Sequence, residues 1–248
     1  MIGRGLEMKV IKFGGSSLAS AEQVKKVIQI IKDDDNRRFV VVSAPGKRSS
    51  NDRKVTDLLI DLYDACITNK ETFATIDAIY QRYVEIAAPF GIDGAVLADI
   101  LESLQTLTTL PIKENPYFLD EILSAGENNN AKLIASICQA SGIPARYINP
   151  KELGIVVTNE PQNAHILTKA YKKIYEWRHT EEILIIPGFF GYTENGQICT
   201  FSRGGSDISG SIVAAGVKAD LYENFTDVDG IFAAHPGVVH TQHTIKEL

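Results

Sequence analysis

Two glycines follow a lysine near the start of the chain, in the segment Lys12–Ser17 (KFGGSS). Paired glycines let a backbone approach a bulky anion and point successive N–H groups toward it. A helix that begins after them would add partial positive charge, and Lys12 would add a full one. The segment matches neither a Walker A loop nor the GxGxxG pattern. It is compatible with a phosphate-binding turn, although Gly-Gly turns after strands are also common without a ligand.

A second paired-glycine turn lies in the segment Thr200–Asp207 (TFSRGGSD). Ser206 or Asp207 is predicted to be the N-cap of the helix that follows, whatever the function of the chain. That structural role does not account for Arg203, whose guanidinium group could bind a carboxylate through two hydrogen bonds. The segment therefore predicts a second place at which an anion could bind.

Two further segments carry carboxylates. In Ser124–Glu127 (SAGE), a glycine lies inside a helical stretch, where it costs about 1 kcal/mol relative to alanine, so another element is expected to approach closely. Glu127 could bind a substrate ammonium group, and an exposed helix glutamate is the simpler alternative. Residues 224–230 (NFTDVDG) close a strand with an ordinary Asp-Gly turn, but in an α/β domain the carboxyl end of a strand is where ligands bind.

The elements that must position these segments alternate along the chain. A run of apolar residues at 8–13, a glycine turn, a helix with period 3.6 capped by Ser20, and a second apolar run at 38–44 predict a βαβ unit. Crossovers of this kind join parallel strands, so the sheet is predicted to be largely parallel. Further strands are predicted at 145–148, 155–158, 183–186, 198–201 and 221–226. Helices are predicted within 55–109, over 117–140 with an interruption at 126–130, and from 206 onward.

Composition excludes several classes of function. The formal charge of −6 over 248 residues argues against a nucleic-acid or anionic-membrane partner. No stretch is apolar for long enough to span a bilayer, and the start of the chain has no signal-peptide pattern. The three cysteines form no CxxC motif, which is typical of a reducing compartment, and a cytoplasmic location is predicted. Residues 1–7 are interpreted as an extension outside the fold.

Five segments in one order resemble the amino acid kinase family, and within it the aspartokinases. They are KFGGSS at 12–17, VTDLL at 55–59, SAGE at 124–127, FSRGGSD at 201–207 and TDVDG at 226–230. SAPGKR at 43–48, followed by a helical insertion, is most similar to the lysine-sensitive subgroup. The resemblance covers 8–248 as one catalytic domain and implies a three-layer αβα sandwich with a largely parallel central sheet. It also implies a helical insertion, at about 55–109, after the second strand.

The same resemblance implies an activity, namely transfer of the γ-phosphoryl group of ATP to the β-carboxylate of L-aspartate, the first step of lysine, threonine and methionine synthesis. Lys12 would stabilise the transferring group, and Asp207 would orient Lys12. The residues implied to hold aspartate are Thr56, Glu127, Arg203 and Ser206. The residues implied to contact the nucleotide are Lys12, Phe13, Gly14, Gly15, Ser16, Thr226, Asp227 and Phe232. Mg²⁺ is expected to be bound by ATP oxygens, with no dedicated protein site.

Three features depart from the family pattern. Phe232 and Gly237 stand where the family usually has a tyrosine and an arginine that hold the nucleotide, so weak ATP binding is expected. The run Asn128–Asn130 is unusually polar for a helix and has no functional interpretation. The chain ends just before the last segment of the family's catalytic domain, so it is expected to be C-terminally truncated, ahead of lysine-binding ACT domains.

Alternative functions remain open. Another kinase of the family is one, although Glu127 and Arg203 in their contexts favour free aspartate over an N-acylated substrate. A non-catalytic amino-acid-binding paralogue is another, and the presence of Lys12 and Asp207 speaks against it. Nucleic-acid binding by the basic loop 47–54 is the weakest, because that loop is more simply a solvated or phosphate-facing edge. A homodimer is one possible assembly.

Overall fold

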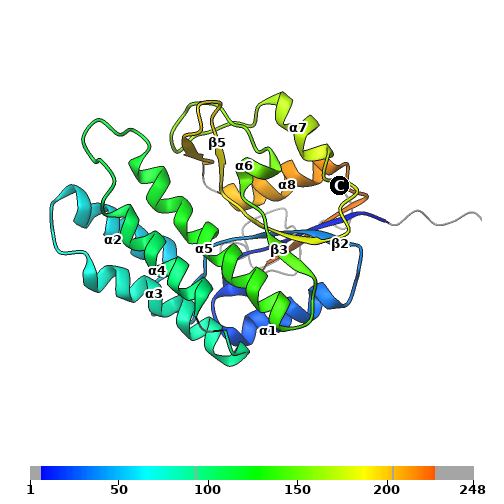
Figure 1. The fold of residues 1–248 in the computed structure, drawn as a ribbon, viewed down its shortest axis with the longest axis horizontal. Coiled ribbons are helices and arrows are strands. Elements are labelled where there is room, and N and C mark those ends of the chain that lie inside the picture. Colours follow the sequence, from blue (N-terminus) through cyan, green and yellow to red (C-terminus); the bar gives the residue numbers. More distant parts are fainter. Residues whose placement is uncertain (1–6, 93, 203, 227–248) are drawn as a thin grey trace, which may run out of the picture.

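The predicted βαβ unit belongs to a five-stranded sheet with strand order β3-β4-β2-β1-β7, in which every neighbouring pair is parallel (Figure 1). The computed structural model describes residues 7–92, 94–202 and 204–226. The strands of this sheet are β1 (Lys9–Phe13), β2 (Arg37–Val42), β3 (Ala145–Tyr147), β4 (Ile183–Pro187) and β7 (Leu221–Phe225). All five were predicted from the sequence, with ends that differ by one or two residues.

The two faces of the sheet carry separate hydrophobic cores. Ile11 and Phe13 of β1 contribute to one core and Val10 to the other, because successive side chains of a strand point to opposite faces. Lys12 follows Val10 by two positions and therefore lies on the same face as Val10, at the carboxyl end of the strand. A charged side chain is thus placed where the apolar face of the sheet ends.

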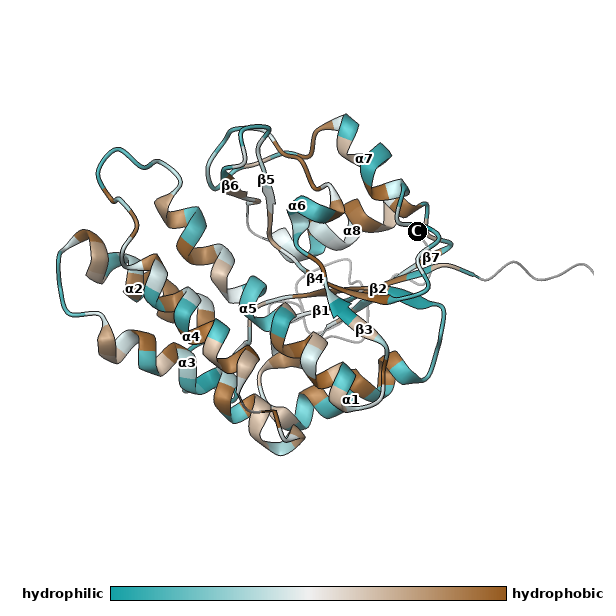
Figure 2. Cartoon of the chain, in the orientation of Figure 1, coloured by the Kyte–Doolittle hydropathy of each residue, from teal (hydrophilic) through white to brown (hydrophobic). Residues whose placement is uncertain are grey.

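Helices cover both faces, which confirms the predicted three-layer αβα architecture. The helices α1 (Ala21–Lys32) and α5 (Phe118–Ala140) pack into the core that contains Ile11. The helices α6 (Pro150–Leu153), α7 (Thr168–Tyr175) and α8 (Gly205–Val217) pack into the other core. In Figure 1, α6, α7 and α8 lie above the sheet and α1 lies below it, and Figure 2 shows hydrophobic colouring on the strands between them.

The first helix matches its predicted pattern in detail. Its apolar residues at i, i+3, i+4 and i+7 are all buried, and Ser20 Oγ accepts a hydrogen bond from Gln23 N–H at 3.4 Å. The predicted helical insertion is also confirmed, as α2 (Val55–Ile67), α3 (Phe73–Ala87), the short 3-10 turn η2 (Ala88–Phe90) and α4 (Ala95–Leu107). These helices extend the core on the α5 side of the sheet.

The predicted interruption of the helix at 126–130 is wrong, since α5 is continuous from Phe118 to Ala140. Gly126 is needed for packing rather than for a break. A Cβ atom at Gly126 would lie 2.9 Å from Ala44 Cβ and 3.1 Å from Leu59 Cδ1. The absence of a side chain therefore lets α5 approach both α2 and the segment that follows β2, as the cost of an interior glycine predicted.

The three asparagines after Glu127 connect α5 to three other parts of the fold. Asn128 Oδ1 accepts a hydrogen bond from Tyr147 Oη at 2.6 Å, and Asn129 Oδ1 accepts one from Ser103 Oγ at 3.0 Å. Asn130 Nδ2 donates to the carbonyl of Ser43 at 2.6 Å. The polar run thus has a structural explanation: its side chains bond β3, α4 and the end of β2.

Two local predictions in the second half of the chain are wrong. Residues 155–158 do not form a strand, because Val156 pairs with Tyr192 and Val157 with Ile166, so that neighbouring residues bridge different partners. The helix α8 is capped by Gly204, whose carbonyl already accepts hydrogen bonds from residues 207 and 208, so Ser206 and Asp207 lie in its first turn. The predicted strand at 198–201 is confirmed as β6 (Ile198–Thr200), which pairs antiparallel with the unpredicted β5 (Phe190–Tyr192).

Within the ranges that the structure describes, no helix has both the length and the apolar character needed to cross a membrane.

Replacing Gly126 by alanine should destabilise the protein, although alanine is the better helix former. Overpacking a core typically costs about 1–3 kcal/mol, while the helix gains only about 1 kcal/mol, so a net loss of up to about 2 kcal/mol is expected. Denaturant unfolding measures it. The double variant Gly126→Ala with Ala44→Gly should recover part of the loss, because the second change removes a methyl group in contact. A more stable single variant would contradict the packing argument.

Candidate active site

A cleft of about 760 Å³ opens at the carboxyl edge of the sheet. In parallel α/β sheets this edge is where ligands bind, at the point where strand order reverses, and here β2 and β7 flank β1 on opposite sides. The cleft brings together side chains or backbone from β1, the starts of α2 and α8, and the middle of α5. The predicted site residues that line it are Lys12, Gly14, Gly15, Thr56, Glu127, Ser206 and Asp207.

The ammonium group of Lys12 is the central charge of the cleft. Lys12 is only 5% exposed, and its Nζ lies 2.7 Å from Oδ1 of Asp207 in the first turn of α8. The same carboxylate oxygen accepts a hydrogen bond from Asn224 Nδ2 at 3.0 Å. Because Asn224 is the register partner of Lys12 on β7, two neighbouring strands and one helix fix the position of this ion pair.

The glycine turn after β1 lies against the segment that follows β2. Gly46 N–H donates to the carbonyl of Gly15 at 2.8 Å, and a Cβ atom on Gly15 would lie 2.8 Å from the carbonyl oxygen of Ala44. Gly15 also begins a 3-10 turn (η1, Gly15–Leu18), so its first N–H groups have no carbonyl partner within that turn. Such N–H groups at the edge of a cleft are suited to bind phosphate oxygens.

Glu127 lies at the bottom of the cleft and is 7% exposed. Burial raises the pKa of its carboxyl group to about 7, although hydrogen bonds from backbone N–H groups and the nearby charge of Lys54 act in the opposite direction. A carboxyl group in this position would be neutral or charged depending on small changes nearby. A bound ammonium group would favour the charged form.

A second buried carboxylate holds one wall of the cleft in place. Asp120 on α5 has no exposed surface, and its Oδ1 accepts hydrogen bonds from Thr200 N–H at 2.6 Å and Thr200 Oγ1 at 2.8 Å. It also accepts two from Gln162, from N–H at 2.9 Å and from Nε2 at 3.3 Å. Thr200 and Gln162 both line the cleft, so Asp120 fixes residues of the cleft wall although Asp120 itself does not line the cleft.

The analysis of the sequence missed several residues that line the cleft. Phe189 follows β4 with a φ of 77°, an uncommon backbone conformation for a residue with a side chain. Ser209 Oγ accepts a hydrogen bond from its N–H, and its carbonyl accepts one from Phe201 N–H, so both backbone groups are fixed. Its place after a buried strand and a Pro-Gly pair was the only signal in the sequence. Lys54, Asp57 and Gln162 also line the cleft. Asp57 belongs to the VTDLL segment, whereas Lys54 and Gln162 carried no motif.

Some predicted site residues lie elsewhere. The Phe13 side chain is fully buried and stacks on Phe225 with ring centroids 5.1 Å apart, so only its backbone could reach a ligand. Ser16 and Thr226 are exposed, the first in η1 and the second directly after β7, and neither is among the residues that line the cleft. The predicted residues Arg203, Asp227 and Phe232, together with Gly237, lie outside the described residues.

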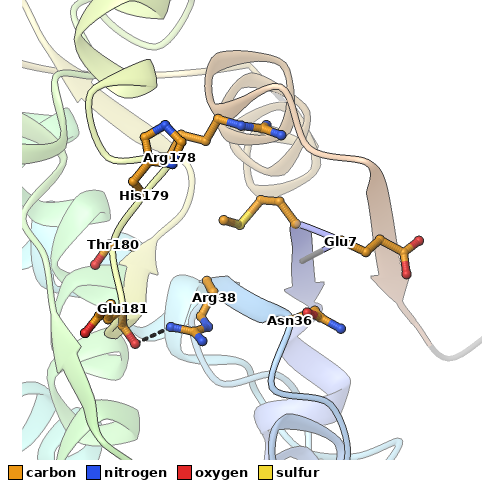
Figure 3. Close-up of a pocket in the computed structure, with 8 residues that line it drawn as sticks. Glu7, Asn36, Arg38, Arg178, His179, Thr180 and Glu181 are labelled. Carbon is orange, nitrogen blue, oxygen red and sulfur yellow. Dashed lines mark hydrogen bonds between the residues drawn. The ribbon is translucent and has the colours of Figure 1, made fainter. Parts of the chain in front are cut away.

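Another cavity, of about 680 Å³, lies at the opposite edge of the sheet, where β1 and β2 begin (Figure 3). It contains two arginines, but both are already engaged with backbone carbonyls. Arg38 donates to Asp35 and Glu181, and Arg178 donates to Val217 and Lys218. The cleft with the Lys12–Asp207 pair is therefore the better candidate for chemistry.

The chain is similar to known proteins in both sequence and fold. The profile of the Amino acid kinase family matches residues 7–248. Aspartokinase 3 of Bacillus subtilis is 46% identical over 242 residues, which are 97% of this chain and 53% of that protein. The crystal structure of Clostridium acetobutylicum aspartate kinase superposes with a TM-score of 0.77 at 37% identity, over 96% of this chain and 52% of the other.

Escherichia coli aspartokinase III, solved in complex with aspartate and ADP, superposes with a TM-score of 0.84 at 26% identity, over 96% of this chain and 53% of the other. The chain thus spans about half the length of these relatives. A family profile that covers nearly the whole chain, and a fold shared with solved members, lead to one conclusion: the chain belongs to the amino acid kinase family.

Proposed function

We propose that the chain is the catalytic region of an ATP-dependent aspartate kinase that forms 4-phospho-L-aspartate. The observation that carries the proposal is the ion pair between the buried Lys12 and the half-exposed Asp207, which faces the same cleft as the buried carboxyl group of Glu127. One end of such a cleft suits a phosphoryl group and the other suits an ammonium group. The similarity to an aspartokinase that was solved with aspartate and ADP supports the same assignment.

In this reaction a β-carboxylate oxygen of aspartate would attack the γ-phosphorus of ATP. The new O–P bond would form while the bond to the β,γ-bridging oxygen breaks, and ADP would leave with that electron pair. The attacking carboxylate is already ionised at neutral pH, so no general base is required. Catalysis then depends on positioning and on neutralising the charge of the phosphoryl group.

Each residue of the cleft has a place in this proposal. Lys12 would contact the transferring phosphoryl group, and Asp207 would keep its ammonium group in position. The N–H groups at the start of η1 would bind phosphate oxygens, and Glu127 would bind the substrate ammonium group. Thr56 and Ser206 would contact aspartate from opposite sides of the cleft, at the starts of α2 and α8. Arg203 would bind the α-carboxylate, a role that rests on its motif alone.

The residues at hand fit a Mg²⁺ ion that is carried by the nucleotide. Within the described part of the chain, no group of three or more His, Cys, Asp or Glu side chains could hold a metal ion. Asp207 is engaged with Lys12, and Glu127 is buried with a raised pKa. Mg²⁺ would therefore take most of its ligands from phosphate oxygens and water, and it would supply charge neutralisation.

The direct test is an assay of ADP release with a panel of amino acids that includes aspartate, glutamate and their N-acetyl forms. Aspartate should be the preferred acceptor. Preference for an N-acetylated acceptor would favour another kinase of the family. Binding of aspartate in a calorimeter without any ADP release would favour a non-catalytic binding module. A homodimer and a cytoplasmic location remain predictions.

Replacing Lys12 by alanine should lower kcat far more than it weakens aspartate binding. The charge of Lys12 is most needed as the phosphoryl group moves, and loss of one preorganised electrostatic group typically lowers the rate by about 10²–10³. Steady-state kinetics measure the effect. Lys9→Ala is a matched control, because Lys9 lies on the same strand and pairs with Asp34 at 2.9 Å, away from the cleft. A Lys12→Ala enzyme with normal kcat and only a higher KM for ATP would refute the catalytic role.

The contribution of Glu127 to the free energy of unfolding should decrease as pH rises from about 4.5 to about 7. In that window the unfolded carboxyl group, with its ordinary pKa of 4.5, loses its proton, while the buried group, with a pKa of about 7, keeps it. The folded state therefore binds more protons, and rising pH favours unfolding. The melting temperature of Glu127→Gln should fall less over this range. Glu102→Gln, which changes an exposed carboxylate, should follow the wild type.

Aspartate binding should show the opposite trend with pH. A substrate ammonium group favours the ionised form of Glu127, so affinity should rise as pH increases toward about 7. Below that pH, binding should release protons, which calorimetry in buffers of different ionisation enthalpy can count. Glu127→Gln should bind weakly and without this proton release. Unchanged proton release in the variant would show that Glu127 does not face the ammonium group.

A further inference from the structure

The loop at residues 46–53 connects the carboxyl end of β2 to the start of α2, between Ser43 and Lys54, which both line the cleft. It contains neither helix nor strand, and it is rich in charged residues. The residues on either side of it are close to the site: Ala44 contacts Gly15, and Lys54 and Thr56 line the cleft. The position of this loop therefore affects both the phosphate-binding turn and the first turn of α2.

One buried side chain from the helical insertion bonds both ends of this loop. Arg82 on α3 is 4% exposed, and its Nη2 donates to the carbonyl of Gly46 at 2.6 Å. Its Nη1 donates to the carbonyl of Arg53 at 2.6 Å and lies 3.2 Å from Oδ2 of Asp52. The single guanidinium group thus holds the first and last residues of the loop at a fixed separation.

Each of the two residues that carry these carbonyl groups adjoins a segment that lines the cleft. Gly46, whose carbonyl accepts from Arg82, donates its own N–H to Gly15 at 2.8 Å. The two backbones are in close contact, since a Cβ atom on Gly46 would lie 2.6 Å from the carbonyl carbon of Gly15. Arg53 immediately precedes Lys54, the N-cap of α2, and Thr56 lies in the first turn of that helix.

The loop also supplies the counter-charge of Arg82. Burial lowers the pKa of Arg82, and the nearby Arg48 adds to this, yet an arginine stays ionised at any ordinary pH. Asp52 supplies the counter-charge, and hydrogen bonds from Arg48 hold the pKa of Asp52 well below its usual range. Apolar side chains would fill such a site at lower cost than a buried ion pair. The presence of a charged group here therefore indicates that the fold requires the hydrogen bonds that the guanidinium group makes.

We propose that Arg82 is a positioning residue for catalysis, which holds loop 46–53 so that the glycine turn after β1 and the first turn of α2 face each other across the cleft. Its effect on activity rests on the kinase function proposed above. The planar guanidinium group is required because its two terminal nitrogens reach two carbonyls at once, whereas a lysine ammonium is a single point of charge. The helical insertion thereby contributes to the site without lining it.

The test compares Arg82→Met, Arg82→Lys and the control Arg146→Met in the full chain. Arg146 serves as the control arginine, since it also makes several polar contacts, to Glu182 and Glu152, but lies on β3 and is not among the residues that line the cleft. A displacement of about 1 Å in a reacting group can cost about 100-fold in rate, so Arg82→Met should lose about 10- to 100-fold in kcat/KM. Arg82→Lys should lose nearly as much, because it cannot reach both carbonyls, and Arg146→Met should stay within about twofold of the wild type.

Amide hydrogen exchange supplies a readout that does not depend on activity. In Arg82→Met, exchange should accelerate at residues 14–16 and 44–56 and stay unchanged in β4. If that variant does not fold, Asp52→Asn serves instead. It removes the counter-charge of Arg82 and also weakens the bonds that Asp52 accepts from Arg48 within the loop, so it should accelerate exchange in the same two segments. Wild-type kinetics in Arg82→Met, or exchange that accelerates uniformly along the chain, would overturn the proposal. If the wild type itself phosphorylates no amino acid, the proposed function fails, and the exchange pattern alone decides the role of Arg82.

Discussion

Burial of the Lys12 ammonium group at the end of β1 would be costly without a negative charge in contact with it. The fold meets this condition by placing the first turn of α8 over the carboxyl edge of the sheet, where Asp207 lies 2.7 Å from Lys12 Nζ. Asn224, on the neighbouring strand, bonds the same carboxylate. The pairing of Lys12 with Asp207 thus depends on the relative positions of β1, β7 and α8. The other residues of the cleft surround this ion pair.

The helix α5 supports the cleft by means of polar side chains that point into the protein. Asp120 fixes the wall formed by Thr200 and Gln162, and Asn130 bonds the carbonyl of Ser43 at the end of β2. Glu127 lies between them and faces the cleft. Buried polar groups of this kind stabilise a fold only when their partners are in place, so they favour one arrangement of α5 against the sheet over all others.

The helical insertion and the αβα sandwich meet at loop 46–53. Arg82 from α3 bonds the loop on one side, and the glycine turn after β1 contacts it on the other. The insertion therefore has a structural connection to the site, in addition to the apolar contacts that it makes with α5. Displacing the loop from this position would break the hydrogen bonds that it accepts from Arg82 and the one that Gly46 donates to Gly15.

The sequence by itself determined the parallel strands, the helical insertion, the cap at Ser20 and the segments from which most of the residues that line the cleft come, because apolar periodicity and glycine turns are local signals. Only the tertiary structure explained Asn128–Asn130, and it showed that α5 continues through Gly126. It also decided the contacts of Asp120 and Arg82, which bond residues 80 and 29 positions away along the chain. A buried polar side chain is defined by its partners, and no local pattern shows which distant groups the fold will bring within hydrogen-bond distance.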